Sequence, residues 1–230
     1  MEKIHLELKE YSHNVRNQKI VEYLNSRNEG EIKAILKEEF KGYKNYFRFA
    51  VLSNYVDIAE VFLKHDANLA NDSLLHDVVR KNLTEMTMTF LQFNMKNIDF
   101  RVFLRTVIMY NHQDVIIYVL KKLRCDITLE DMLYFAAIFG STQIAKILIV
   151  YGAEIDFIFV KKIFGFGVFS DGSALSLAVR YRSLETVNLL LSFGASLNIR
   201  GMDRLFPIET SLEHRNNSLF KSMIMYNGLK

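Results

Sequence analysis

Apolar residues recur along this chain as pairs of short helical patterns separated by a single turn. The clearest two segments are 131–156, DMLYFAAIFGSTQIAKILIVYGAEID, and 173–198, SALSLAVRYRSLETVNLLLSFGASLN. Each predicts a short apolar helix, a tight turn, a second apolar helix, and then Gly-Ala followed by alternating apolar and polar residues. Since both segments show the same features in the same order, we interpret them as copies of one unit. Such repetition predicts a solenoid, in which neighbouring units cover each other's apolar faces.

One residue in the middle of each first helix, small in the two clearest units, gives the units a common register. These register residues are Ala50, Val78, Val107, Ala136, Ala178 and Ser211, with a poorer match at Leu24. The apolar stripe of each second helix follows at a similar distance, which supports the same alignment. The chain therefore predicts an all-α helical-repeat solenoid of about seven helix pairs. The repeat array would span residues 18–230, preceded by an N-terminal cap segment, residues 1–17.

The turns between predicted helices repeat the same residue types. Four residues after the register residue stand Asn54, Asn82, Asn111 and Gly140, and after the second helices stand Asp66, Asn94, Gly152, Gly194 and Asn227. Gly, Asn and Asp tolerate the left-handed conformation in which many helices end. We therefore expect left-handed helix ends at these positions. Leu123, Arg182 and Arg215 depart from the rule.

The units resemble ankyrin repeats. Ala136-Ala137 and Ala178-Val179 occupy the family's pair of small residues, and 152–156 and 194–198 resemble its Gly-Ala-Asp-Val-Asn motif, with a weaker copy at 66–69. The family's Thr-Pro-Leu-His opening is absent nearly everywhere, and only Pro207-Ile208 keeps the proline. Because those polar links between units are mostly missing, we expect cohesion to depend on packing of Phe, Ile and Leu.

The resemblance implies an ankyrin-type binding scaffold whose first helices and hairpin tips line a concave face. The two residues after the pair of small residues would point into it: Leu52-Ser53, Arg80-Lys81, Met109-Tyr110, Ile138-Phe139, Arg180-Tyr181 and Glu213-His214. Among these we predict Arg80, Lys81, Tyr110, Ile138, Phe139, Arg180 and Tyr181 as partner-binding residues, since aromatic residues and Arg concentrate binding energy. The alternative is that these side chains pack under a neighbouring connection.

The connection between the two clearest units is unusually long and apolar. Ala136 and Ala178 are 42 residues apart, and the excess falls in 157–173, FIFVKKIFGFGVFSDGS. Its phenylalanines are Phe157, Phe159, Phe164, Phe166 and Phe169. Alternation and the Gly-Phe-Gly segment predict an extended hairpin arm that binds a partner through these rings. The alternative is an arm folded back into a gap between units.

Composition argues against several other functions. Twenty-nine basic against twenty-six acidic residues give a net charge of +3, too little for the basic stripe typical of nucleic-acid binding. The single cysteine, Cys125, excludes an intrachain disulfide and fits a reducing compartment. No apolar run approaches the length of a membrane span. The six histidines are scattered, and P-loop and Gly-x-Ser-x-Gly motifs are missing, so we expect no metal, no cofactor and no enzymatic activity.

The sequence therefore predicts a non-catalytic scaffold that binds another protein and sequesters or blocks it. The chain resembles divergent ankyrin proteins of viruses and intracellular bacteria that act on host or rival proteins. That resemblance implies a cytoplasmic location, in the host where the source is a pathogen. The alternative function is recognition of a small or phosphorylated ligand by a basic corner formed by Arg80, Lys81 and Arg105.

Overall fold

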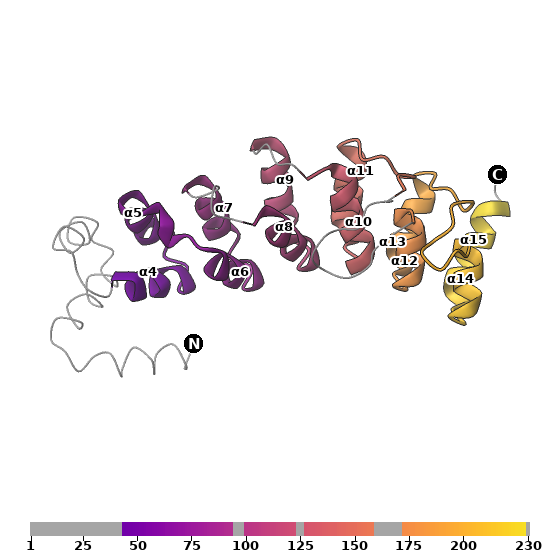
Figure 1. The fold of residues 1–230 in the computed structure, drawn as a ribbon, viewed down its shortest axis with the longest axis horizontal. Coiled ribbons are helices and arrows are strands. Elements are labelled where there is room, and N and C mark those ends of the chain that lie inside the picture. The colour runs from indigo at the N-terminus through magenta and orange to yellow at the C-terminus, as the bar shows by residue number, and fades with distance from the viewer. Residues whose placement is uncertain (1–42, 94–98, 123–126, 159–171, 229–230) are drawn as a thin grey trace. The chain divides into compact units, whose positions relative to one another are not determined.

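The computed structural model describes residues 43–93, 99–122, 127–158 and 172–228. The chain divides into two compact units, Met1–Asp99 and Phe100–Lys230. Within the described ranges the regular structure is helical throughout, in twelve α-helices and one 3-10 turn, with no strand (Figure 1). The predicted all-α class is therefore confirmed.

Unit 1 contains two described helix pairs and the 3-10 turn between them. They are α4 (Tyr43–Leu52) with α5 (Val56–His65), η1 (Ala67–Leu69), and α6 (Asp72–Arg80) with α7 (Thr84–Phe93). First helix α4 contacts first helix α6, and second helix α5 contacts second helix α7. Each helix also contacts its own partner, so the two pairs share one apolar core.

Unit 2 contains four further pairs stacked in the same manner (Figure 1). They are α8 (Phe100–Met109) with α9 (Gln113–Lys122), α10 (Leu129–Phe139) with α11 (Thr142–Val150), α12 (Ala174–Arg180) with α13 (Leu184–Ser192), and α14 (Pro207–Glu213) with α15 (Asn217–Gly228). First helices contact first helices in the order α8, α10, α12, α14, and second helices in the order α9, α11, α13, α15. Six of the predicted pairs are thus present, while the seventh and the cap segment lie outside the described residues.

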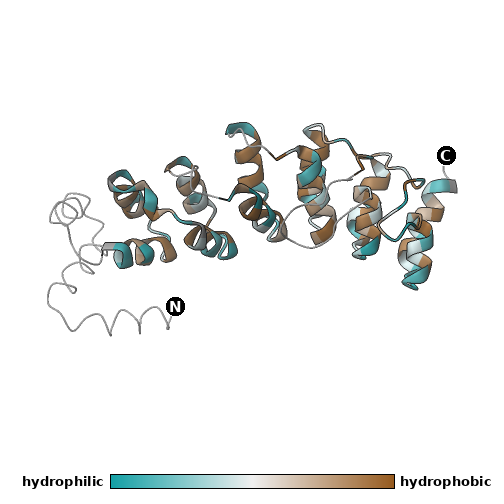
Figure 2. Ribbon diagram, in the orientation of Figure 1, coloured by the Kyte–Doolittle hydropathy of each residue, from teal (hydrophilic) through white to brown (hydrophobic). Residues whose placement is uncertain are grey.

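The register residues explain why the pairs stack so closely. Ala50, Val78, Val107, Ala136, Ala178 and Ser211 all lie in first helices and all are 0% exposed. A residue with few side-chain atoms lets the helix approach its neighbours, and apolar side chains around it fill the remaining volume. Apolar and polar residues alternate around each helix in Figure 2, as expected of helices packed on one face.

The turn after every described first helix is left-handed. The φ angles are 59° at Asn54, 59° at Asn82, 58° at Asn111, 68° at Gly140, 61° at Arg182 and 50° at Arg215. The two arginines therefore adopt the conformation of the Asn and Gly positions even though their residue type does not favour it. In these two units the packing of the helix pair imposes the turn on an unfavourable residue.

We expect Arg182→Gly to raise the free energy of unfolding by about 1 kcal/mol, because glycine removes the steric cost of a Cβ at positive φ. Lys146→Gly is the matched control, since Lys146 is exposed within α11 and glycine there should cost about 1 kcal/mol. Urea titration of the full chain followed by circular dichroism measures both. A lower free energy of unfolding in Arg182→Gly than in the wild type would show that the turn at Arg182 is not strained.

The ends of the second helices follow the prediction of left-handed turns at Gly, Asn and Asp less closely. Gly152 and Gly194 have positive φ, of 101° and 92°, as predicted. The prediction for Asp66 is wrong, because its φ is −143° and its carboxylate instead accepts a hydrogen bond of 3.0 Å from the Asn68 N–H. Asp66 thereby caps η1. Asn227 lies inside α15 rather than after it, and Asn94 lies outside the described residues.

Hydroxyl groups join consecutive pairs of unit 2, which the sequence analysis did not foresee. Ser141, at the turn between α10 and α11, donates from its buried Oγ to the Ile108 carbonyl of α8. Thr142 of α11 and Thr186 of α13 lie 2.8 Å apart at their Oγ1 atoms. A satisfied hydrogen bond between buried groups holds two elements in one register, because breaking it leaves an unpaired polar group. Polar links therefore add to the packing of Phe, Ile and Leu on which cohesion was expected to depend.

Carboxylates add two further links on the connections. Asp156 accepts a 2.8 Å hydrogen bond from the Ser196 N–H, which joins the segments after α11 and α13. Glu130 of α10 accepts one of 3.1 Å from the Glu154 N–H. Burial raises the pKa of Glu130, but the hydrogen bonds from the Glu154 and Glu130 N–H groups and the Thr128 hydroxyl together hold it below its ordinary value. Thr128 caps α10, accepting from the Asp131 N–H at 3.1 Å.

Candidate protein-binding surface

The C-terminal ends of three stacked first helices bring together five of the predicted binding residues of unit 2, with Met109 beside them. We call this set the aromatic row: Met109 and Tyr110 at the end of α8, Ile138 and Phe139 of α10, and Arg180 and Tyr181 at the end of α12. Because α8 contacts α10 and α10 contacts α12, equivalent positions on these helices are neighbours. The shared register and these helix contacts therefore put the six residues at neighbouring positions.

The row exposes large side chains to solvent. Met109 is 44% exposed, Tyr110 41% and Tyr181 44%, whereas Ile138 and Phe139 are half-buried. Exposed apolar and aromatic side chains of this size are informative when they lie next to each other. The alternative, that these residues pack beneath a connection, applies in part to Ile138 and Phe139 and not to the other three.

Ring contacts hold the aromatic row in place. Phe139 stacks on Phe135 one turn earlier in α10, with centroids 6.5 Å apart and planes at 16°. The Arg105 guanidinium of α8 lies 5.7 Å from the Phe139 centroid, a cation–π contact between neighbouring pairs. Tyr110 stacks on His112 at 6.3 Å. Side chains ordered before binding lose less conformational entropy when a partner arrives.

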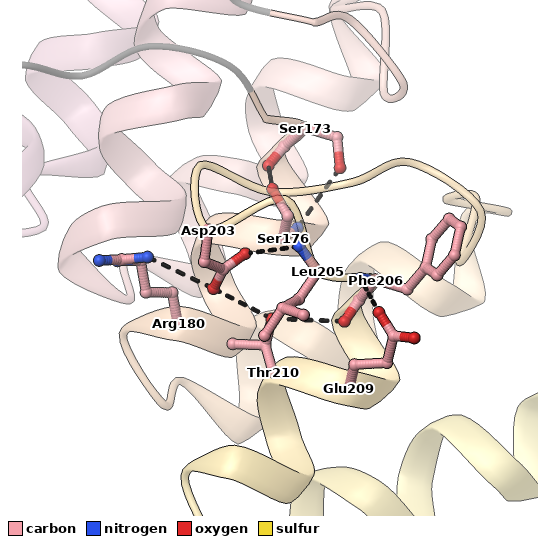
Figure 3. Close-up of polar contacts among 8 residues, drawn as sticks. All are labelled: Ser173, Ser176, Arg180, Asp203, Leu205, Phe206, Glu209 and Thr210. Carbon is pink, nitrogen blue, oxygen red and sulfur yellow. Dashed lines mark hydrogen bonds and ion pairs between the residues drawn. The ribbon is translucent and has the colours of Figure 1, made fainter.

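Arg180, at the end of the row, is held by a polar network that Figure 3 shows. Its guanidinium lies 3.4 Å from Oδ2 of Asp203, which also accepts a 3.2 Å hydrogen bond from the Thr210 hydroxyl. The other oxygen of Asp203 accepts from the Leu205 N–H at 3.1 Å. Asp203 thus fixes both the connection before α14 and the direction of Arg180. The sequence analysis missed Asp203, because its partner lies 23 residues away and no local pattern marks it.

Among the predicted basic residues, Arg80 has an acidic partner and Arg105 an aromatic one. Arg80 and Lys81 lie in unit 1 and both are exposed. Arg80 pairs with Asp77 at 3.0 Å, and Asp77 also lies 3.6 Å from Arg48. Arg105, the third residue of the proposed basic corner, lies in unit 2 over the Phe139 ring. The proposed basic corner would need residues of both units and stays a prediction.

The predicted arm can be followed only at its ends. Phe157 is 39% exposed and Ile158 47%, while Gly172 and Ser173 are buried where the chain enters α12. Phe159, Phe164, Phe166 and Phe169 lie outside the described residues. The binding role of the arm stays a prediction.

Among the residues that the structure describes, no group of three or more His, Cys, Asp or Glu side chains could hold a metal ion. Among the same residues, no helix is both long enough and apolar enough to cross a membrane.

Comparison with known proteins identifies the repeat. Residues 172–202, which include α12, α13 and the Gly194–Asn198 segment, match the family model of the ankyrin repeat. The structure matches the crystal structure of the human ASB11 ankyrin repeat domain with a TM-score of 0.57 and 16% sequence identity, over 78% of this chain and 81% of that one. The fold is an ankyrin-repeat fold.

The ankyrin repeat found by the family model is one of the two units in which the sequence motif is clearest. None of the curated proteins compared with the chain matches it in sequence. The other repeats are therefore recognised through helix order and packing, which tolerate divergence better than individual residues do. Ankyrin repeats generally mediate interactions between proteins.

Proposed function

We propose that this chain is a non-catalytic scaffold that binds a partner protein and thereby sequesters or blocks it. The observation that supports this most is the aromatic row, which combines an apolar centre with exposed Tyr110, Tyr181 and Arg180. Tyr and Arg are the residue types that dominate binding energy at protein interfaces, and a row already ordered binds at lower entropic cost. On the family resemblance, the same proposal places the protein in the cytoplasm, including that of a host cell.

The chemistry of the row also indicates the kind of partner. Arg180 keeps 40% of its side chain exposed while Asp203 neutralises it, so it can donate hydrogen bonds without requiring a strongly acidic partner. Met109 and Tyr110 supply apolar surface at the other end of the row. We therefore propose a partner segment that presents apolar side chains and backbone or side-chain acceptors.

Alanine at both tyrosines of the row, Tyr110→Ala with Tyr181→Ala, is expected to reduce partner affinity at least about tenfold, because each removes a large exposed anchor. The partner is first captured with the wild-type chain and identified, and its affinity for each variant is then measured by titration. Tyr151→Ala is the matched control, since Tyr151 is a tyrosine of similar exposure, 42%, at the end of α11.

An equal loss of partner affinity in Tyr151→Ala and in the double variant, or an unchanged affinity in the double variant, would show that the row is not part of the interface. A parallel titration with Phe164→Ser and Phe166→Ser tests the predicted arm separately. A competition assay against the partner's own ligands then distinguishes blocking from simple attachment, because only a blocking scaffold displaces them.

A further inference from the structure

The α14–α15 pair exposes part of the face that the other described pairs bury or half-bury. In each first helix, the residue three positions before the register residue and the residue one position after it lie on the same side of the helix. The first of these positions holds Phe47, Leu104, Leu133 and Leu175, which are at most 2% exposed. The second holds Val51, Ile108, Ala137 and Val179, all 0% exposed. In α14 the same two positions are Ile208, which is half-buried, and Leu212, which is 55% exposed.

The second helices show the same difference. Nine residues after the register residue stand Ala59, Ile116, Ala145 and Val187, all 0–2% exposed. Thirteen residues after it stand Leu63 and Leu191, which are buried, and Leu120 and Ile149, which are half-buried. In α15 the equivalent residues are Phe220, half-buried, and Ile224, 47% exposed. We call Ile208, Leu212, Phe220 and Ile224 the terminal face.

A contact in unit 1 shows what these positions normally pack against. Phe47 of α4 stacks on Phe90 of α7, which belongs to the following pair, at 5.8 Å between centroids. The face is therefore the one that a pair offers to the next pair. The terminal face keeps four apolar residues with the spacing of a helix-pair interface.

Charges beside the terminal face complement each other under two-fold rotation. On α14 the exposed Glu209 and Glu213 follow the Ile208–Leu212 side of the helix, and on α15 the exposed Lys221 lies next to Phe220. A two-fold axis through the face would set α14 of one chain against α15 of another. Carboxylates would then meet an ammonium group on both sides of the axis, because an interface of this kind uses the same patch twice.

We propose that the terminal face is a homodimer interface, in which α14 and α15 of two copies of this chain pack against each other about a two-fold axis. A second copy brings a helix pair with apolar residues at the spacing that each earlier pair receives. That second copy also brings the carboxylates of α14 and the ammonium group of α15 that would pair across the axis. This interface is separate from the aromatic row, so dimerisation would place two rows in one assembly.

Sedimentation velocity of the full chain over a range of concentrations tests the proposal. We expect a species of twice the 26.8-kDa chain mass. Ile224→Glu should raise the dimer dissociation constant at least about tenfold, because it buries a charge in an apolar contact. Met225→Glu is the matched control: Met225 is the adjacent residue, is 69% exposed, and lies outside the face, so this variant should dimerise as the wild type does.

Charge reversal provides a second measurement that does not alter the apolar residues. Lys221→Glu should weaken the dimer, and the double variant Lys221→Glu with Glu213→Lys should restore it, because the pairing returns with opposite signs. Circular dichroism confirms that each variant folds. The proposal would be overturned if the wild-type chain stayed monomeric. It would also be overturned if neither Ile224→Glu nor Lys221→Glu changed the dimer dissociation constant.

Discussion

Replacing Phe47 with alanine is expected to lower the free energy of unfolding of unit 1 by about 3–5 kcal/mol. The side chain is 2% exposed and contacts two other rings, stacked on Phe90 at 5.8 Å and tilted against Phe62 at 5.9 Å. Removing it leaves a cavity between two helix pairs as well as losing the transfer free energy of the ring. Since a pair cannot cover its own apolar face, both pairs should lose protection together.

Hydrogen exchange followed by mass spectrometry measures the protection of α4 to α7, and urea titration gives the free energy. Phe49→Ala is the matched control in the same helix, because Phe49 is half-buried and contacts Tyr55 edge-on at 6.1 Å. It should cost clearly less, about 1–2 kcal/mol, since part of the vacated space is open to water. Equal losses in the two variants would show that Phe47 does not join the pairs.

Enlarging Ala178 to leucine is expected to cost about 1–3 kcal/mol, because a 0% exposed position has no room for three further carbons. Ala178 lies in α12, which contacts α10, α13 and α14, so the strain should spread to the pairs on both sides. The physical cause is distance: a larger side chain at the register residue forces the helices apart.

Asn188→Leu provides the comparison, since Asn188 is exposed in the middle of α13 and should change the stability by less than about 0.5 kcal/mol. Urea titration measures the two variants, and hydrogen exchange locates the affected helices. If Ala178→Leu matched the wild type, the interpretation of the register residues as the closest points between pairs would be wrong.

The sequence was informative about the aromatic row because the row follows from register. Once Ala136 and Ala178 were aligned, Phe139 and Tyr181 fell near equivalent positions on neighbouring first helices. Their exposure could not be predicted in the same way. Phe139 is half-buried because Phe135 and Arg105 contact it, whereas Tyr181 is 44% exposed. Both depend on which side chains reach across from the neighbouring helix.

Features missed by the sequence analysis connect residues far apart in the chain. Asp203 holds Arg180 across 23 residues, and Ser141 reaches the Ile108 carbonyl across 33. Single serines and aspartates carry no local pattern, because the same residue types also serve as helix caps and turn residues. The terminal face likewise became visible only when the burial of equivalent positions could be compared.

By itself, the sequence determined the helix pairs, their register and the left-handed turns at Asn54, Asn82, Asn111 and Gly140. These properties are local, because helical periodicity and tolerance of positive φ are set by residues within a few positions of each other. Only the tertiary structure decided that Arg182 adopts the same turn, that Asp203 orients Arg180, and that Leu212 is left exposed. Those outcomes depend on what neighbouring helix pairs place against a residue, and packing between pairs is not encoded in local sequence.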